Sequence, residues 1–184
     1  LVTTTMELLR SAAPPATDTV YFVTDPGREG LFFYDPRDNS SADNDGTVIV
    51  SSSGAVFKRL IENDVYSVKW FGAKGNGNAD DTSAIQRTVD AVQRQGGGVV
   101  FLPSGNYVIT SAILFSTYIH IVGAGKVATN LSNRGSDYAF RPSDVTKVTR
   151  HASIGHLRIS GRAGNAGGIL VQNCNQCVFD NVEF

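Results

Sequence analysis

Between residues 69 and 125 the sequence holds one amphipathic helical segment, and only short apolar segments separated by glycine-rich turns follow it. Two of these apolar segments are GGVVFLPSGNY at residues 97–107 and IHIVGAG at residues 119–125. Segments this short cannot bury an apolar face alone, and they are typical of a solenoid in which successive turns of the chain stack. A single helix ahead of such strands indicates the closed first end of the solenoid.

The helix is predicted over residues 82–95. Asp81 is the expected N-cap, Asp80 adds negative charge at the positive end of the helix, and the three glycines that follow end it. Three branched side chains form one apolar stripe at helical spacing: Ile85, Val89 and Val92. Their burial contributes about 1.5–3 kcal/mol each, and we expect them to cover the open end of the strand stack. The adjacent carboxylates also admit an active-site interpretation, although the helix start explains both.

Three motifs of this region resemble the start of the right-handed parallel β-helix in the pectate-lyase-like superfamily. They are FGAKG at 71–75 with DDT at 80–82, the run at 97–107, and VGAG at 122–125. The resemblance implies a mainly β chain with a small N-terminal α/β module, a capping helix and the first coils of a right-handed parallel β-helix. Within the superfamily the chain looks most like the N-terminal part of a bacteriophage tailspike or polysaccharide depolymerase. The motifs are specific for this fold and not for one reaction, because the superfamily includes lyases, hydrolases, epimerases and tailspikes.

Residues 1–66 are predicted to form the small N-terminal module, and residues 67–184 the start of the β-helix domain, truncated at its C-terminal end. In the module, Thr4 and Glu7 have capping-box spacing for a short helix. Four apolar segments are expected strands: 20–23, 31–34, 47–50 and 56–60. The polar run at 41–46 faintly resembles a calcium loop but lacks the closing acidic ligand, so a turn is predicted there.

An apolar pattern returns after 25 positions near the end of the chain: Ile154, Leu157 and Ile159 are followed by Phe179, Val182 and Phe184. This interval predicts one coil of a solenoid, with paired strands about 4.8 Å apart. The segment at 119–121 fits the same phase as 157–159, at an offset of 38. A long excursion loop is therefore expected within residues 123–150. Phe184 is expected to point inward, and the lack of a polar cap after it indicates that further coils follow.

The predicted coil register places six polar side chains on one outer face: Tyr118, His120, His156, Arg158, Asn181 and Glu183. Because side chains alternate between the two faces of a strand, the 25-residue step sets Asn181 beside His156, and Glu183 beside Arg158. The first two residues are expected to join the same two columns from an earlier coil. Two interpretations stay open for this ladder. It is either a glycan-contacting strip or a solvated face with an ion pair worth under about 1 kcal/mol.

Other motifs have structural interpretations. Cys174 and Cys177 form an isolated C-x-x-C without the second pair that a zinc ribbon requires, so small side chains at a turn are predicted. GAGKVA at 123–128 matches a dinucleotide-binding fingerprint, but no helical pattern follows it. We therefore predict no cofactor and no metal ion. Trp70 lies between the two predicted modules, where packing is expected rather than stacking on a sugar ring.

Composition excludes some classes of partner. The chain has 16 Lys and Arg residues against 17 Asp and Glu residues, for a formal net charge of −1, which gives no attraction to nucleic acid or anionic lipid. No apolar run approaches the ~18 residues that indicate a membrane span. We therefore predict no nucleic-acid partner and no membrane span.

No catalytic set is recognised in these residues. Glycosidase chemistry needs two carboxyl groups about 5–10 Å apart across the scissile bond. The predicted β-helix offers four carboxylates: Asp137, Asp144, Asp180 and Glu183. Only the last two fall in the repeat, and their three-residue spacing turns them to opposite faces of a strand. Whether the chain belongs to an enzyme stays open.

The resemblance implies three hypotheses for function. The first is the N-terminal portion of an extracellular protein that binds and degrades polysaccharide and recognises a host surface glycan. As in tailspikes, this implies a homotrimer, with residues 1–66 contacting a virion tail or baseplate. The second is a secreted bacterial hydrolase or lyase of the same superfamily. The third is a structural or attachment protein without activity. The expected location is a virion tail or the extracellular space.

Overall fold

The structure is a computed structural model that describes residues 1–15, 19–161 and 167–184. Contacts divide the chain into two compact units. One comprises Leu1–Glu62 with Trp70–Gly72, and the other comprises Asn63–Lys69 with Ala73–Phe184. Within the described ranges, no helix is both long and apolar enough to cross a membrane.

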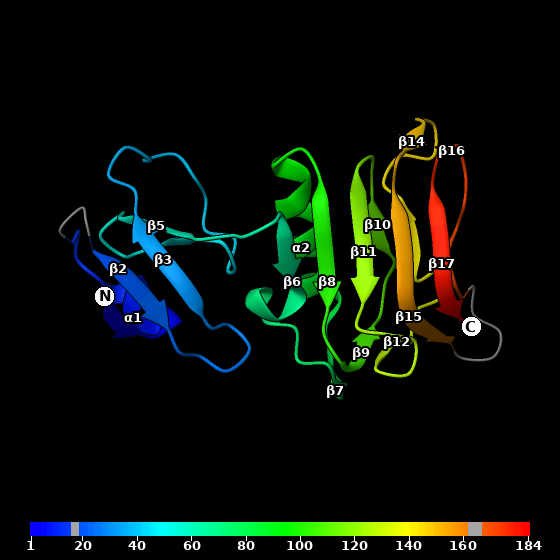
Figure 1. Ribbon diagram of the computed structural model, residues 1–184, viewed down its shortest axis with the longest axis horizontal. Helices are drawn as coiled ribbons and strands as arrows, with labels where there is room; N and C mark the ends of the chain where they lie inside the picture. Colours follow the sequence, from blue (N-terminus) through cyan, green and yellow to red (C-terminus); the bar gives the residue numbers. More distant parts are fainter. Residues whose placement is uncertain (16–18, 162–166) are drawn as a thin grey trace. The chain divides into compact units, whose positions relative to one another are not determined.

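The first unit is a five-stranded sheet with one short helix, α1 (Met6–Ser11) (Figure 1). In sheet order its strands are β1 (Val2–Thr4), β2 (Val20–Val23), β3 (Gly30–Tyr34), β5 (Val56–Arg59) and β4 (Val48–Val50). β1 runs parallel to β2, and the other neighbours are antiparallel. The four predicted strands are confirmed to within one residue at each end. The core joins Met6 and Leu9 of the helix to sheet residues such as Phe32 and Phe57.

The start of α1 differs from the predicted capping box. The N-cap is Thr5, whose hydroxyl accepts a hydrogen bond from the Leu8 N–H at 3.2 Å, while Thr4 is the buried last residue of β1. The carboxylate of Asp25 accepts the Met6 N–H at 2.8 Å and satisfies a second free donor of the first turn. The cap lies one residue later than predicted because β1 extends through Thr4.

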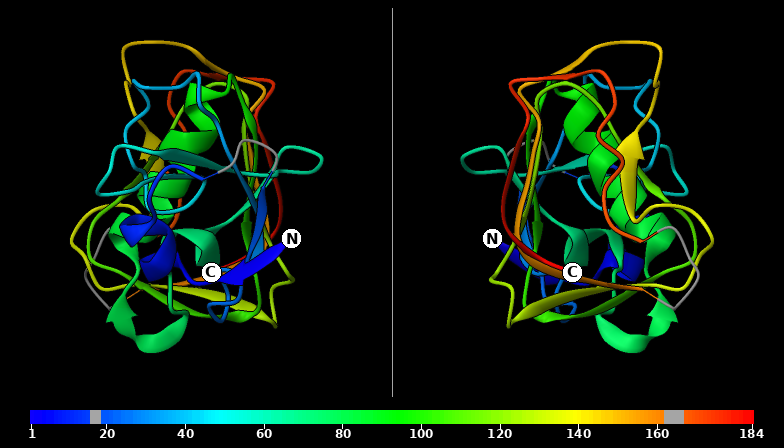
Figure 2. Two further views of the ribbon diagram at one scale, coloured as in Figure 1. Left: turned by 90° about the vertical axis from the view of Figure 1, so that its left-hand side faces the viewer. Right: turned by 90° about the vertical axis from the view of Figure 1, so that its right-hand side faces the viewer.

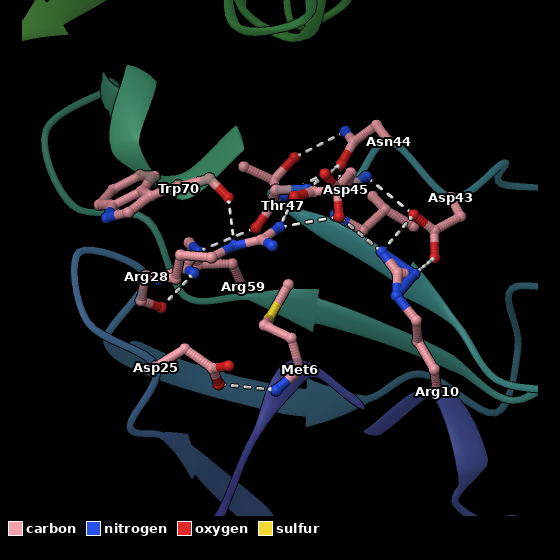
Figure 3. A network of polar contacts seen from close by, with 12 residues as sticks. Met6, Arg10, Asp25, Arg28, Asp43, Asn44, Asp45, Thr47, Arg59 and Trp70 are labelled. Carbon is pink, nitrogen blue, oxygen red and sulfur yellow. Dashed lines mark hydrogen bonds and ion pairs between the residues drawn. The ribbon is translucent and has the colours of Figure 1, made fainter. Parts of the chain in front are cut away.

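A buried arginine organises the first unit (Figure 3). Arg59 is 4% exposed and donates to the carbonyl oxygens of Gly46, Glu29 and Arg28 at 2.8–3.0 Å. Its guanidinium carbon lies 4.6 Å from the Phe32 ring centroid and 4.5 Å from that of Trp70. Burial, and next the charge of Arg28, lower the pKa of Arg59 to about 10, so the group stays protonated at neutral pH. Trp70 is therefore held by a cation–π contact, with the guanidinium at its ring.

The acidic run at 41–46 forms a turn, as predicted (Figure 3). Asp43 accepts from Arg10 at 2.6 Å, and Asp45 forms ion pairs with both Arg10 and Arg28 at 2.8 Å. Asn44 closes the turn by accepting the N–H groups of residues 46, 47 and 48. The carboxylates thus bind arginines, and the described residues contain no cluster of three or more metal-ligating side chains.

The second unit is a parallel β-helix (Figures 1 and 2). One sheet stacks β6 (Val65–Ser67), β8 (Gly98–Leu102), β11 (Ile119–Gly123), the first half of β15 (Ser153–Gly161) and β17 (Val178–Glu183). A second sheet stacks β7 (Asn76–Asp80), β9 (Gly105–Ile109), β12 (Thr129–Asn133) and the second half of β15. Shorter stacks pair β10 (Ile113–Phe115) with β13 (Phe140–Pro142), and β14 (Thr149–Arg150) with β16 (Cys174–Asn175). Every one of these pairs is parallel, which confirms the predicted fold class.

The predicted 25-residue coil is confirmed. Ile154 pairs with Phe179, and Leu157 pairs with Val182, so the second residue of each pair follows the first by 25 positions. Viewed along the stack, the strands of successive rungs lie over one another (Figure 2). The inward side chains of these rungs, such as Ile121, Leu131 and Leu157, are fully buried.

The predicted excursion loop within 123–150 is wrong. This segment contains β12, β13 and β14 and completes a rung of the stack. Ile121 pairs with Ile154, an offset of 33 and not of 38. The sequence pattern did not indicate this rung because two inward positions of β12 are polar. Thr129 and Asn133 are 0% and 1% exposed, and each satisfies its side chain with local backbone groups.

Helix α2 (Thr82–Arg94) follows β7 as β10 follows β9, so it takes the third-strand position of the first rung. It packs against β6, β8, β10 and β11, and its predicted apolar stripe is fully buried. The amide of Gln86 pairs with the backbone of Leu114 in β10: its Nε2 donates to the carbonyl at 3.1 Å, and its Oε1 accepts the N–H at 2.8 Å. A side chain therefore completes a ladder that a strand completes elsewhere, and the predicted capping role of the helix is confirmed.

The two carboxylates at the helix start have different roles. Asp81 is 1% exposed and makes no side-chain capping bond; it accepts the backbone N–H groups of Lys74 and Gly75. Asp80 is exposed and accepts the Thr82 N–H at 3.0 Å and the Thr110 hydroxyl at 2.7 Å. Asp81 is thus the N-cap residue, as predicted, but its side chain fixes the turn of the FGAKG motif, and Asp80 accepts the N–H of the first helical residue.

Phe184 continues the column of the buried Ile159 in the register of β15 and β17, and its ring lies beside Gly168. Its side chain is 77% exposed, and Val178 at the start of β17 is 56% exposed. β17 pairs with β15 along one edge, and no strand of the described ranges covers its other edge. Apolar side chains at this end therefore lack a rung to pack against.

These roles predict unequal costs for two neighbouring substitutions. Asp81→Ala leaves two partly buried N–H groups without the acceptor they have now and should lower the free energy of unfolding of the β-helix unit by about 3 kcal/mol. Asp80→Ala removes an exposed cap and should cost about 1 kcal/mol. Urea denaturation followed by circular dichroism measures both. Equal losses, or a larger loss for Asp80→Ala, would contradict these assignments.

Candidate functional site

The outer face of β15 and β17 carries four of the six predicted contact residues. Arg158 Nη2 lies 2.7 Å from Glu183 Oε1, and the Asn181 amide nitrogen lies 3.0 Å from His156 Nδ1. Both predicted pairings are therefore confirmed, and their role toward a ligand stays a prediction. The side chains of the ion pair are 45% and 40% exposed, so the pair contributes under about 1 kcal/mol to stability.

His156 and Asn181 also shape the chain. Both have left-handed backbone, with φ of 56° and 50°, at the point where the strand bends from the first sheet into the second. Asn and His are enriched in this conformation among non-glycine residues. Gly123 occupies the same column one rung earlier, where an added Cβ would lie 2.4 Å from the His156 carbonyl oxygen. The bend therefore explains these side chains without a ligand, and close packing explains the first glycine of the apparent nucleotide fingerprint. Strand β12 follows that fingerprint where a nucleotide site needs a helix.

Tyr118 and His120 do not join these columns as predicted. Because the preceding rung is 33 residues long, His120 pairs with Ser153, and its Nδ1 lies 2.9 Å from the Ser153 hydroxyl. Tyr118 stacks on His151, with ring centroids 5.4 Å apart and planes within 4°. The six predicted residues thus form two groups, one on β15 and β17, and the other where β11 and β15 begin.

A polar strip on the second sheet was missed by sequence reasoning. Asn130 Nδ2 donates to Asn106 Oδ1 at 2.8 Å, and the Ser160 hydroxyl donates to Asn130 Oδ1 at 3.0 Å. In register, Asn106 and Asn130 lead directly to Arg158 and Glu183. We call Asn106, Asn130, Ser160, Arg158 and Glu183 the outer strip. Polar residues at outward positions were visible in the sequence, but aligning them requires the length of each rung.

The carboxylates of the β-helix do not pair with one another. Asp137 lies 3.0 Å from Arg141, Asp144 lies 3.3 Å from Lys147, and Glu183 pairs with Arg158. Asp180 lies 3.9 Å from His156 Nε2. Each of these four carboxylates therefore faces a basic side chain, and none of the four pairs with another of them.

The two cysteines lie in and just after a short strand. Both are free, and Cys174 begins the two-residue strand β16. Burial, followed by the neighbouring Cys177, raises the pKa of the Cys174 thiol to about 11, so it stays protonated at neutral pH. This agrees with a structural role beside a turn.

Comparison with known families matches two parts of the chain separately. Residues 65–184 match the family described as Rhamnogalacturonase A/epimerase, pectate lyase-like. Residues 2–63 match a phage tail protein small four-stranded beta-sheet domain.

Individual relatives are of two kinds. Alginate lyase 7 of Azotobacter vinelandii is 48% identical over 67 residues, or 33% of this chain and 8% of that protein. Mannuronan C5-epimerase AlgE2 of the same organism is 35% identical over 119 residues, or 56% of this chain and 11% of that protein. A tailspike of Acinetobacter baumannii bacteriophage Fri1, a capsular polysaccharide depolymerase, superposes with a TM-score of 0.80 at 15% identity, over 99% of this chain and 37% of that one. The chain spans about a tenth of the length of these curated relatives, and its likeness to the tailspike concerns the fold.

Proposed function

Because the chain belongs to the Rhamnogalacturonase A/epimerase, pectate lyase-like family, we propose that it is part of a tailspike-like protein. This protein binds and modifies a surface polysaccharide. The observation that carries this proposal is the order of the two matches. A phage tail domain at residues 2–63 precedes a pectate lyase-like β-helix at 65–184 in one chain. In this proposal the first unit attaches to a virion tail, and the β-helix contacts the host glycan outside the cell.

The outer strip supports glycan binding by its chemistry. It presents amide, hydroxyl, guanidinium and carboxylate groups on adjacent rungs, and these groups complement the hydroxyls of a sugar chain. Asn106 is exposed and Asn130 is half-buried, so one side chain is held in place while its neighbour remains accessible. A rigid sheet keeps the rungs at a constant spacing of about 4.8 Å, which favours recognition of an extended polymer.

A second candidate is a secreted bacterial enzyme acting on an alginate-like glycan. The identities of 48% to an alginate lyase and 35% to a mannuronan epimerase favour it. The phage tail match over residues 2–63 favours the tailspike. Both candidates require glycan binding, and they differ in the assembly and location of the protein.

Glycan binding is tested by passing the chain over immobilised alginate and a panel of bacterial capsular polysaccharides. We expect retention on at least one polymer, and Asn130→Ala should weaken it about three- to tenfold because the strip loses the amide that links its rungs. Asn39→Ala, in an exposed loop of the first unit, is the matched control and should change nothing. A folded chain that no polymer retains would contradict the proposal.

Assembly separates the two candidates. A tailspike-like protein should form a stable homotrimer, giving a light-scattering mass three times the 19.6 kDa of the chain. A monomer at every concentration measured would count against the tailspike and favour the secreted enzyme.

A further inference from the structure

Three successive rungs enter the first sheet through a left-handed residue. Tyr118, His151 and Gln176 have φ of 62°, 50° and 56° and precede β11, β15 and β17. The strand registers place them in one column, together with Gly97 one rung earlier. The corner, meaning the turn by which each rung enters the first sheet, therefore requires left-handed backbone at this position. It requires no particular side chain.

Tyrosine is an unfavourable residue for the left-handed backbone at that corner. Left-handed backbone brings Cβ close to the following carbonyl, and Gly, Asn and Asp tolerate it best. The chain uses glycine at Gly97 of this column, and Asn or Asp at most of its other non-glycine left-handed positions. Tyr118 is also 50% exposed, so its ring does not fill the core. Neither the backbone conformation of the turn nor packing in the core accounts for an aromatic ring at position 118. We attribute the ring to the outer surface that it forms.

The ring belongs to a surface with three further features. His151 stacks on it, with parallel rings whose centroids lie 5.4 Å apart, so one face of the tyrosine ring is turned to the histidine. His120 and Ser153, each two residues further along its strand, form a hydrogen-bonded pair on the outer face. Arg150 is exposed, and its carbonyl accepts the Tyr118 N–H at 3.0 Å. Its guanidinium has no ion pair or hydrogen bond with the described parts of the chain.

We propose that Tyr118, His151 and Arg150 form a subsite that receives one carboxylate-bearing pyranose of a glycan, with His120 and Ser153 at its edge. One face of a pyranose ring is lined with C–H groups that pack on aromatic rings, while its hydroxyls bond to polar neighbours. The guanidinium offers paired donors with the geometry of a carboxylate. This subsite rests on the proposed glycan-binding function and lies apart from the residues of the outer strip.

A purely structural stack is the competing explanation, and one substitution separates the two. Tyr118→Asn removes the ring and supplies a residue that tolerates the left-handed corner. If the ring serves a ligand, the melting temperature stays level or rises while affinity falls. If the stack only joins rungs, the melting temperature falls while affinity holds.

The affinity of the 184-residue chain is measured by calorimetry with a mannuronate hexasaccharide, which carries a carboxylate on every ring, and with neutral maltohexaose. Tyr118→Asn should weaken mannuronate binding about tenfold or more, and Tyr118→Phe should preserve it. Arg150→Gln should weaken it about fivefold without affecting any binding of maltohexaose. Asp64→Asn, at a left-handed position that precedes β6, is the ring-free control and should leave affinity unchanged.

Two failures are distinguishable. If the wild-type chain binds mannuronate and Tyr118→Asn binds it equally well, the subsite is overturned while glycan binding stands. If the wild-type chain binds neither hexasaccharide nor any polymer of the panel, the subsite and the proposed function fall together. Equal binding of the two hexasaccharides would overturn the acidic-sugar assignment.

Discussion

Every parallel rung presents two rows of backbone donors and acceptors, and the stack is stable only where both rows are satisfied. Inside the β-helix, neighbouring strands satisfy them. At the first end, β6 and β7 extend two of the sheets by one strand each, and α2 occupies the place of the third. Gln86 pairs with Leu114 as a strand would, and the apolar stripe of α2 closes the core above it. The order of helix and strands in the sequence is thus a consequence of how this end is closed.

The sequence pattern predicted those features of the fold that depend on large apolar residues at a fixed interval. Ile154, Leu157 and their partners 25 positions later are such residues. The pairing of β15 with β17 could therefore be predicted from the sequence. The rung before it could not, because Thr129 and Asn133 point inward and are satisfied by backbone groups of nearby turns. An apolar sequence pattern indicates buried positions only where the buried side chains are themselves apolar. The N-cap position of Asp81 was predicted, but the partners of its buried carboxylate, the N–H groups of Lys74 and Gly75, were not.

Candidate contact residues depend on rung length more strongly than the fold does. Arg158 and Glu183 were paired correctly because one confirmed coil separates them. Tyr118 and His120 were placed beside the wrong partners because the excursion loop shifted their rung by five residues. Hydrogen-bonded neighbours on the second sheet, Asn106 and Asn130, were not recognised for the same reason. Outer residues carry no apolar signal of their own, so their columns follow only from the register of the inward residues.

The register of the stacked rungs is the central claim, and interstrand nuclear Overhauser effects in an isotopically labelled chain measure it directly. Ile154 should show backbone contacts with Ile121 on one side and Phe179 on the other, and Leu131 should contact Ile159. Contacts that join Ile121 to Ile159 instead would restore a long loop between these strands. They would contradict the rung arrangement, and with it both groups of candidate contact residues.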